Sequence, residues 1–269
     1  MSGATEAIRG FVRNRAGISL GADKDYLVLS RLEPRLRGWR VPTLDNLVER
    51  LRSQPTGSLA NDVVAALTTN ETLWFRDGKP FEALRDIILP DLLARRAADR
   101  TLAIWSAACA TGQEVYSIAM TLRDEGEKLR NWRTSILGSD ICEPAVNRAG
   151  AGCYTQFEVQ RGLPIQRLVR YFEQAGDAWR VRPELRAGVD FRTLNLLDLP
   201  GGLGPFDVVF CRNVLIYFDI DVKLHVLTAI AGRLRPSGYL ILGGAESTLG
   251  LATPFAPVPD STGIYRKTA

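Results

Sequence analysis

The chain is poor in the residues that hold metals or form disulfide bonds. It has a single histidine, His225, and four widely spaced cysteines among 269 residues. No zinc or disulfide pattern can be assembled from them, so we expect a protein of a reducing compartment with no metal site. His225 stands in a helical apolar pattern, and we interpret it as a surface or packing residue and not as a proton acceptor.

Long apolar runs are missing too. No segment has the roughly 18 consecutive apolar residues that a membrane-spanning helix needs, and residues 1–15 lack the apolar core of a signal peptide. Low-complexity linkers and internal repeats are also absent. These absences predict a cytoplasmic protein without membrane insertion.

The excess of positive charge is small. The formal net charge is +4 and the sequence pI is near 9.0. The densest basic stretch is RLEPRLRGWR, in which Glu33 is the only acidic residue. We define the basic patch as its arginines: Arg31, Arg35, Arg37 and Arg40. This patch is either a solvated surface or a docking face for an acidic partner.

The apolar pattern changes near residue 100. Before it, apolar residues recur at helical spacing, which predicts a helical domain over 1–78 and a connecting helix over 79–100. After it, apolar strands alternate with helices, which is typical of a parallel sheet covered on both faces, so we expect an α/β domain over 101–269. Its expected strands are 102–107, 135–140, 206–211 and 239–243, and its expected helices lie near 113–125, 143–150 and 220–234.

A small β insertion is expected inside this domain. Residues 179–182 and 189–194 have the pattern of short strands on either side of RPELRAG, and they predict a hairpin-like subdomain over about 172–194. Residues 263–267 are expected to close the sheet as an edge strand.

Residues 101–120 form the most informative segment. An apolar strand runs into the small residues Ala107, Ala108, Ala110 and Gly112, and a helix follows. Small residues let a backbone approach a ligand closely, and the start of a helix offers unpaired N–H groups. This pattern predicts a nucleotide-sized pocket at the carboxyl end of the strand.

The composition of this turn argues against a bound phosphate. It has one glycine where dinucleotide-binding folds have GxGxxG. Glu114, just inside the helix, would repel a phosphate and suits a cationic group, such as the ammonium or sulfonium of S-adenosylmethionine. A carboxylate favoured by the helix dipole is the alternative interpretation of Glu114.

Polar residues at two further strand ends indicate the same crevice. Asp140 ends the expected second strand, where a carboxylate commonly accepts hydrogen bonds from ribose hydroxyls; capping of the next helix is the alternative. Arg212 and Asn213 follow another buried strand. We therefore expect a ligand site between these strand ends.

The segment TTNETLWFRD, residues 68–77, joins the helical domain to the sheet domain. Asn70, Thr72 and Arg76 can project toward one ligand while the apolar residues 73–75 anchor the segment. A polar interdomain loop with an aromatic plug is the alternative.

Six segments of the chain match, in the same order, the motifs of one known protein family. They are TTNETLWFR, WSAACATGQEVYSIAM, SDICEPAVNRAGAGCY, NLLDLP, FDVVFCRNVLIYF and GYLILGGAEST. Together they resemble the CheR family of chemotaxis receptor methyltransferases, over roughly residues 5–268. The resemblance implies a Rossmann-like S-adenosylmethionine methyltransferase sheet, an N-terminal all-helical domain and a small antiparallel β insertion. It also implies methyl transfer from S-adenosylmethionine to glutamate side-chain carboxylates on the cytoplasmic helical bundle of chemoreceptors.

The resemblance further implies a set of cofactor contacts. Arg76 is the candidate for positioning a carboxylate, either the cofactor's or the substrate's. Asn195 would meet the adenine edge, with a simple turn residue as the alternative. The product would be S-adenosylhomocysteine, and no metal would take part. The implied contacts are Asn70, Thr72, Arg76, Glu114, Asp140, Asn195 with Leu196, and Arg212 with Asn213.

The resemblance also bears on partners. The expected insertion is short and lacks the glycine-rich loop with which pentapeptide-tethered members hold a receptor's C-terminal tail. The chain therefore resembles the pentapeptide-independent members. We expect a monomer whose helical domain and basic patch dock directly on the receptor.

Other functions compete with this interpretation. A nucleic-acid methyltransferase would suit the fold and the pI, but amino-methylating enzymes of that kind carry an Asn/Asp-Pro-Pro-aromatic motif where this chain reads CRNVLIYF. We therefore expect no nucleic-acid partner. The second competitor is a non-catalytic adaptor that senses S-adenosylmethionine, and the filled ligand positions disfavour it.

Overall fold

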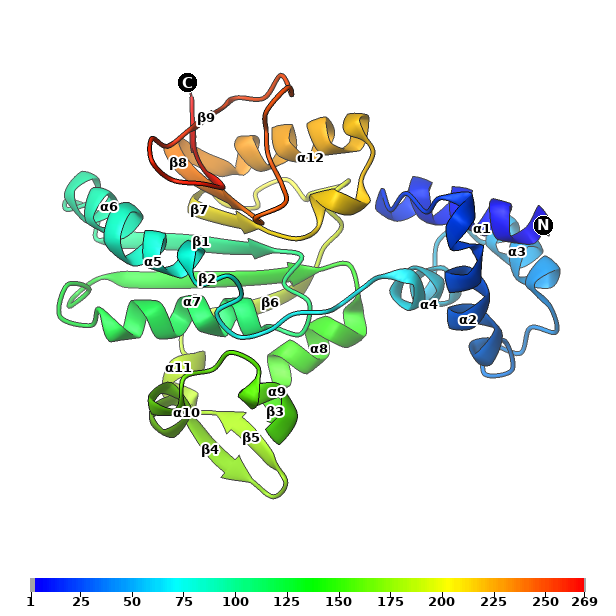
Figure 1. Ribbon diagram of the computed structural model, residues 1–269, viewed down its shortest axis with the longest axis horizontal. Helices are drawn as coiled ribbons and strands as arrows, with labels where there is room; N and C mark the ends of the chain where they lie inside the picture. The colour runs from blue at the N-terminus through cyan, green and yellow to red at the C-terminus, as the bar shows by residue number, and fades with distance from the viewer. Residues whose placement is uncertain (1–2, 269) are drawn as a thin grey trace.

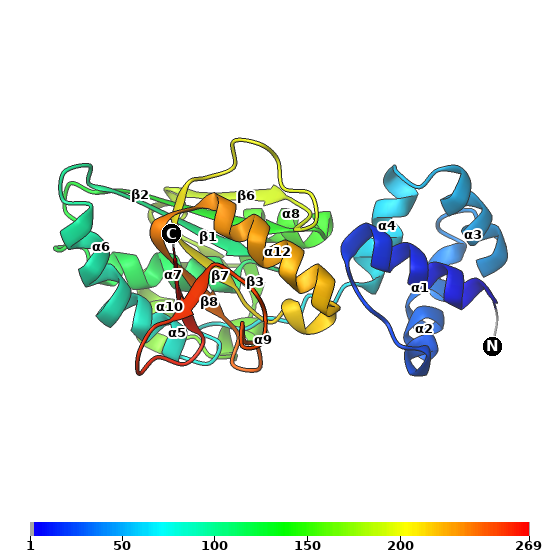
Figure 2. The same cartoon turned by 90° about the horizontal axis from the view of Figure 1, so that it is seen from above.

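The computed structural model describes residues 3–268, which form a helical domain and a larger sheet domain (Figure 1). The helical domain lies beyond one end of the sheet in both views (Figures 1 and 2). Ile8, Val12, Val28 and Leu32, which recur at helical spacing, are fully buried between its helices. The bounds are α1 Gly3–Ala16, η1 Ala22–Lys24, α2 Asp25–Leu36, α3 Leu44–Ser53 and α4 Ser58–Leu67.

A helical connection leads into the sheet domain. It consists of α5 (Lys79–Ala83), a π-helical turn η2 (Leu84–Ile88) and α6 (Leu89–Arg95). Apolar residues of this connection share a core with α7 (Gln113–Asp124). Within residues 3–268, no helix is both long and apolar enough to cross a membrane.

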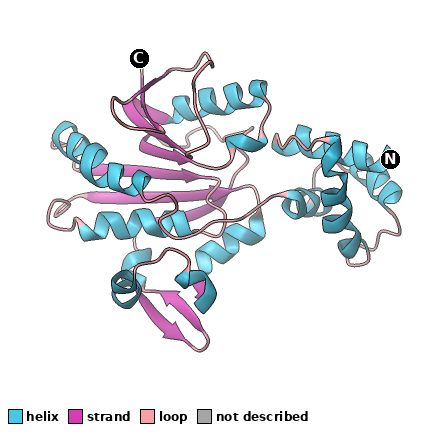
Figure 3. Ribbon diagram, viewed as in Figure 1, coloured by secondary structure: helices cyan, strands magenta, loops and turns pink. Residues whose placement is uncertain are grey.

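A seven-stranded sheet forms the centre of the larger domain (Figure 3). Its strand order is β6-β2-β1-β7-β8-β10-β9. The first five strands in this order are mutually parallel, and β10 and β9 add an antiparallel edge. This arrangement confirms the predicted α/β fold. The prediction that residues 263–267 form the edge strand is wrong, because β10 lies between β8 and β9 and the short strand β9 forms the edge. The bounds are β1 Thr101–Ala107, β2 Arg133–Asp140, β6 Val189–Thr193, β7 Phe206–Cys211, β8 Leu234–Leu242, β9 Phe255–Pro257 and β10 Ile264–Lys267.

Alternate side chains of the strands enter two separate cores. In β1, Trp105 and Ala107 pack into a core that includes α12 (Ile220–Arg233) and the helical domain. Leu102 and Ile104 point to the opposite face, into the core with α7. The sheet is buried on both faces for this reason, which explains why its strands read as continuous apolar runs.

The predicted β insertion is partly wrong. Residues 189–193 form β6, which pairs in parallel with β2 at an edge of the main sheet instead of belonging to a hairpin. A five-residue strand has no sequence feature that selects its partner, and pairing with β2 covers an otherwise open edge. The small antiparallel sheet has the order β3-β5-β4 and begins before residue 172. Its strands are β3 Cys153–Thr155, β4 Phe172–Ala175 and β5 Ala178–Val181.

Short helices precede, connect and follow the strands of this small sheet. They are α8 Glu143–Ala151, α9 Gln156–Gln160, α10 Ile165–Tyr171 and α11 Pro183–Arg186. Asp124, at the end of α7, holds α10 through Arg167 at 2.9 Å and Tyr171 at 2.5 Å. The small sheet is therefore attached to the main domain by polar contacts as well as by packing.

Gly138 in β2 offers a test of the packing. A Cβ atom there would lie 2.7 Å from the Phe191 ring and 2.7 Å from Cγ2 of Val115. Gly138→Ala should therefore lower the free energy of unfolding by about 1–3 kcal/mol, because the core has no room for a methyl group. Gly150→Ala is the control: its Cβ would meet nothing within 4 Å, and alanine in a helix should raise stability by about 0.5–1 kcal/mol. Urea denaturation measures both, and equal stabilities would contradict this packing.

Candidate functional site

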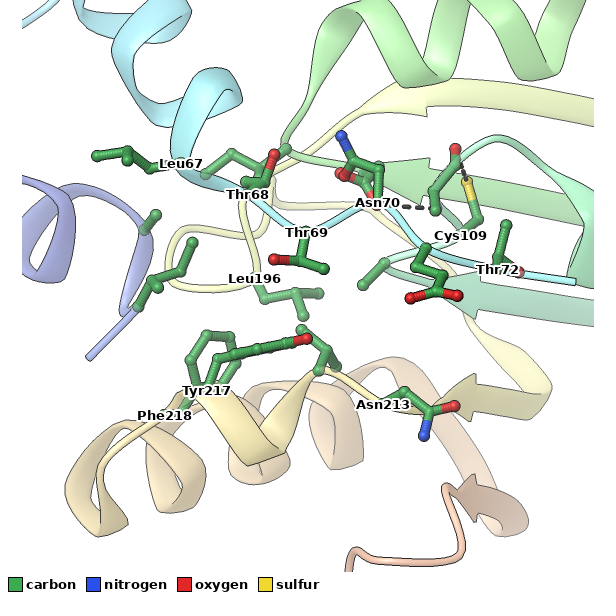
Figure 4. A pocket seen from close by; sticks show the side chains of 18 of the residues that line it. Leu67, Thr68, Thr69, Asn70, Thr72, Cys109, Leu196, Asn213, Tyr217 and Phe218 are labelled. Carbon is green, nitrogen blue, oxygen red and sulfur yellow. Dashed lines mark hydrogen bonds between the residues drawn. The ribbon is translucent and has the colours of Figure 1, made fainter. Parts of the chain in front are cut away.

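A pocket lies where the carboxyl ends of β1, β2 and β7 face the helical domain (Figure 4). It encloses about 1200 Å³, including its open mouth. The helical domain contributes Lys24, Leu27 and Arg31 of η1 and α2 to its lining. Every residue predicted to contact the cofactor lines this one pocket: Asn70, Thr72, Arg76, Glu114, Asp140, Asn195, Leu196, Arg212 and Asn213.

Asp140 organises the small-residue turn that follows β1. Its Oδ2 accepts a hydrogen bond from the backbone N–H of Ala110, and its Oδ1 accepts one from Cys142, both at 2.9 Å. Burial raises the pKa of Asp140 above its usual value, and these amide hydrogen bonds oppose that shift. Asp140 therefore fixes the loops after β1 and β2 and also faces the pocket.

The turn itself requires small residues. Ala108, Ala110 and Gly112 have positive φ angles of 60°, 48° and 92°. A Cβ atom on Gly112 would lie 2.7 Å from Cβ of Ala149 in α8. The glycine is thus required by backbone conformation and by close packing on α8, in addition to any ligand.

Arg212 is the most buried charged side chain of the site. Its side chain is 1% exposed, and its Nη1 donates to Oε2 of Glu114 at 2.8 Å. Its Nη2 donates to Oδ2 of Asp77 at 2.6 Å and to the carbonyl oxygen of Arg76 at 2.9 Å. The guanidinium thus joins β7, the start of α7 and the segment 70–77.

Glu114 has a partner that the sequence did not reveal. Besides Arg212, it accepts a hydrogen bond from Oγ of Ser106 at 2.8 Å, so both carboxylate oxygens are engaged. Glu114 is therefore already paired with the positive charge of Arg212. A cationic ligand attracted by Glu114, as predicted, would lie next to that charge. Glu114 lines the pocket, and its contact with the cofactor stays a prediction.

Apolar residues anchor the segment 70–77, as expected. Trp74 is fully buried, with its ring edge-on to Tyr154 at 4.8 Å and to Phe172 at 5.3 Å between centroids. The backbone N–H of Phe75 donates to Oγ of Ser117 at 3.1 Å. These contacts hold the chain while its polar side chains line the pocket.

The polar residues of this segment differ in their partners. Nδ2 of Asn70 donates to Sγ of Cys142 at 3.1 Å. Nη1 of Arg76 donates to the carbonyl oxygen of Glu71 at 3.3 Å, and within residues 3–268 Arg76 forms no ion pair with a carboxylate. Arg76 therefore offers a positive charge to the pocket that no acid of the described chain neutralises.

Asn195 connects the site to the helical domain. Its Nδ2 donates to the carbonyl oxygen of Arg15 at 2.8 Å, and its Oδ1 accepts from the backbone N–H of Leu197 at 3.1 Å. The side-chain amide is thus used within the chain, and the predicted contact with adenine remains a prediction. Leu196 beside it is buried at the pocket wall.

Some residues of the site carry weaker sequence signals. From the sequence, Tyr217 and Phe218 are interpreted as packing residues, with a place beside the substrate as the alternative for Tyr217; both line the pocket (Figure 4). Glu246 was not singled out, although its carboxylate binds the loop that carries these residues. Its sequence signals are its place in the segment GYLILGGAEST and its position shortly after the last parallel strand.

The expectations for a metal and for His225 have separate outcomes. In the described part of the chain, no group of three His, Cys, Asp or Glu side chains is arranged to hold a metal ion. The prediction of a metal-free enzyme is not tested by that observation. His225 is exposed, and its Nε2 lies 2.9 Å from the carbonyl oxygen of Leu197, which confirms a surface position.

The ion pair of Arg212 gives a prediction about stability. Arg212→Met should lower the free energy of unfolding by about 3–5 kcal/mol, because Glu114 keeps a buried charge without a partner. Arg192→Met is the matched control, since Arg192 and Asp190 are 60% and 58% exposed, and its loss should cost less than about 1 kcal/mol. Urea denaturation of the unliganded protein measures both changes, and equal losses would contradict the assigned role of Arg212.

Comparison with known proteins gives the family of the chain. The family description "CheR methyltransferase, SAM binding domain" matches residues 70–264, and "CheR methyltransferase, all-alpha domain" matches residues 4–68. The chain is 43% identical to chemotaxis protein methyltransferase Cher2 of Pseudomonas putida, over 96% of this chain and 95% of that protein. It is 45% identical to chemotaxis protein methyltransferase 1 of Pseudomonas aeruginosa, over 97% and 96% respectively.

A more distant relative has the same kind of name. The chemotaxis protein methyltransferase of Escherichia coli is 36% identical, over 89% of this chain and 82% of that protein. The matched regions include both the helical domain and the sheet domain with its pocket. The chain belongs to the CheR family of S-adenosylmethionine-dependent chemotaxis methyltransferases.

Proposed function

We propose that the protein transfers a methyl group from S-adenosylmethionine to glutamate side-chain carboxylates of chemoreceptors, as a cytoplasmic monomer. The observation that carries the proposal is the convergence of all the expected contact residues on one pocket. These residues come from segments far apart in the sequence, so their meeting is not a consequence of local spacing. The family supports the reaction class.

The residues of the pocket fit this cofactor. Asp140 lines the pocket at the end of β2, and we assign its carboxylate to accepting hydrogen bonds from ribose hydroxyls. Arg76 supplies an unpaired positive charge for a carboxylate, whereas Arg212 is already neutralised by Glu114 and Asp77. Glu114 at the start of α7 would repel a phosphate there, so a nucleoside with a single carboxylate suits this end of the pocket better.

The proposed reaction requires little from the protein beyond positioning the two reactants. When bound, S-adenosylmethionine supplies an electrophilic methyl group on a sulfonium, and the S–C bond breaks with its electron pair remaining on sulfur. A glutamate carboxylate with an ordinary pKa of about 4.3 is already ionised at neutral pH, so no general base is required. The tasks of this chain are therefore to bind, to orient and to exclude water. Arg76 is the residue we assign to orienting a carboxylate.

The helical domain is proposed to dock on the receptor. Arg31 of the basic patch turns inward, where its Nη1 donates to the carbonyl oxygens of Leu67 and Thr68, both at 3.0 Å. Arg37 and Arg40 are exposed. Because η1 and α2 also line the pocket, an acidic helical bundle held by Arg37 and Arg40 would lie beside the pocket mouth. This direct mode needs no pentapeptide tether.

The competing functions are less well supported. The relatives are named chemotaxis methyltransferases, which favours neither a nucleic-acid methyltransferase nor a non-catalytic adaptor.

Methyl labelling tests the proposed reaction. We expect membranes that carry the host's chemoreceptors to gain label from methyl-labelled S-adenosylmethionine, and the label to be released by mild alkali, as carboxyl methyl esters are. Alkali-stable label would contradict a glutamate ester. Cofactor binding without any label would favour the adaptor.

Charge reversal tests the docking surface. Arg37→Glu with Arg40→Glu should lower the rate of receptor methylation at least tenfold at low ionic strength, because an acidic partner would be repelled. The affinity for S-adenosylhomocysteine should stay unchanged. Arg100→Glu with Arg130→Glu is the control, since both arginines are exposed and precede β1 and β2. The amino ends of these strands point away from the helical domain (Figure 1). Equal methylation rates for the two double variants would remove the docking proposal.

A further inference from the structure

Within residues 3–268, the buried carboxylate of Glu246 forms hydrogen bonds with backbone amides only. The residue is 8% exposed, and no ion pair with a cation is formed by it within residues 3–268. Its Oε2 accepts from the N–H groups of Asn213 and Gly243, each at 2.8 Å. Its Oε1 accepts from Val214 at 2.9 Å and from Ile216 at 3.3 Å. The buried charge is therefore stabilised by oriented N–H dipoles.

These hydrogen bonds join the loops that follow neighbouring strands. β7 and β8 pair in parallel up to Cys211 and Leu242, and beyond that point no strand pairing holds the chains together. Asn213 has a φ of 59°, in the left-handed region that few residues other than glycine and asparagine adopt easily. The carboxylate thus holds a loop whose conformation is not fixed by the sheet.

The loop held by Glu246 lines the pocket and also contacts the helical domain. Asn213, Tyr217 and Phe218 line the pocket (Figure 4). Val214 also lines it. The carbonyl oxygen of Tyr217 also accepts a hydrogen bond from the N–H of Ser19, at 2.8 Å, in the segment between α1 and α2. One wall of the pocket and one contact between the sheet domain and the helical domain therefore depend on the same loop.

We propose that Glu246 is a positioning residue for cofactor binding: its carboxylate fixes the loop 213–218 in the shape that completes the pocket. This inference rests on the proposed function, because it takes the pocket as the S-adenosylmethionine site. Glu246 is not placed to touch the cofactor in this account, and it acts through the backbone of the loop.

Glu246→Gln tests the proposal with little change in volume. Glutamine keeps one acceptor oxygen but turns an NH₂ group toward the remaining N–H donors, so those hydrogen bonds are lost. Isothermal titration of the full chain with S-adenosylhomocysteine should show a Kd at least tenfold higher than that of the wild type. Thermal melting of the same unliganded samples separates the roles, because a purely structural residue would lower Tm and leave the Kd of the folded protein unchanged. A Kd within twofold of the wild type would overturn the proposal.

A pair of neighbouring glycines gives a second test that keeps Glu246 intact. A Cβ on Gly243 would lie 2.7 Å from Oε2 of Glu246 and 2.9 Å from Nδ2 of Asn213, whereas a Cβ on Gly244 would meet nothing within 4 Å. Gly243→Ala should therefore weaken binding of S-adenosylhomocysteine, and Gly244→Ala should bind as the wild type does. If Glu246→Gln yields no folded protein, equal affinities of the two alanine variants would overturn the proposal.

The wild-type titration separates this inference from the function on which it rests. Failure of the wild type to bind S-adenosylhomocysteine would overturn the proposed function, and the inference with it. Tight binding by the wild type together with unchanged binding by the variants would overturn the role of Glu246 alone.

Discussion

The buried guanidinium of Arg212 is the interaction on which the architecture of the pocket depends. It connects Glu114 at the start of α7 with Asp77 and the backbone of Arg76, and it does so almost without contact with water. Burial of such a group is tolerated because its charge is matched by carboxylates and most of its donors are satisfied. The segment that carries Asn70, Thr72 and Arg76 is consequently fixed to the sheet domain.

Buried carboxylates fix the other loops that border the pocket. Asp140 binds amides of the loops after β1 and β2, and Glu246 binds amides of the loops after β7 and β8. In each case a carboxylate replaces the strand pairing that ends at the edge of the sheet. A crevice at the carboxyl ends of parallel strands would otherwise be bordered by free loops. Rigid walls are what a reaction governed by positioning requires.

The sequence predicted those features that depend on apolar pattern and on strand ends. Asp140 and Arg212 were identified because each follows a buried apolar run, and parallel strands bring such ends together. The pairing of Arg212 with Glu114 was not predictable, since side-chain geometry across 98 residues leaves no local signal. Residues 189–193 were misassigned because a short alternating strand fits a hairpin and a sheet edge equally well. Glu246 was missed because its partners are backbone amides, which any residue type provides.

We propose that S-adenosylmethionine occupies the pocket lined by Arg76 and Asp140. A crystal structure of the protein with S-adenosylhomocysteine would test this proposal. We expect ribose hydroxyls within hydrogen-bond distance of the Asp140 carboxylate and the carboxylate of the ligand beside the Arg76 guanidinium. A ligand bound elsewhere, or bound in this pocket without contact to either residue, would contradict it.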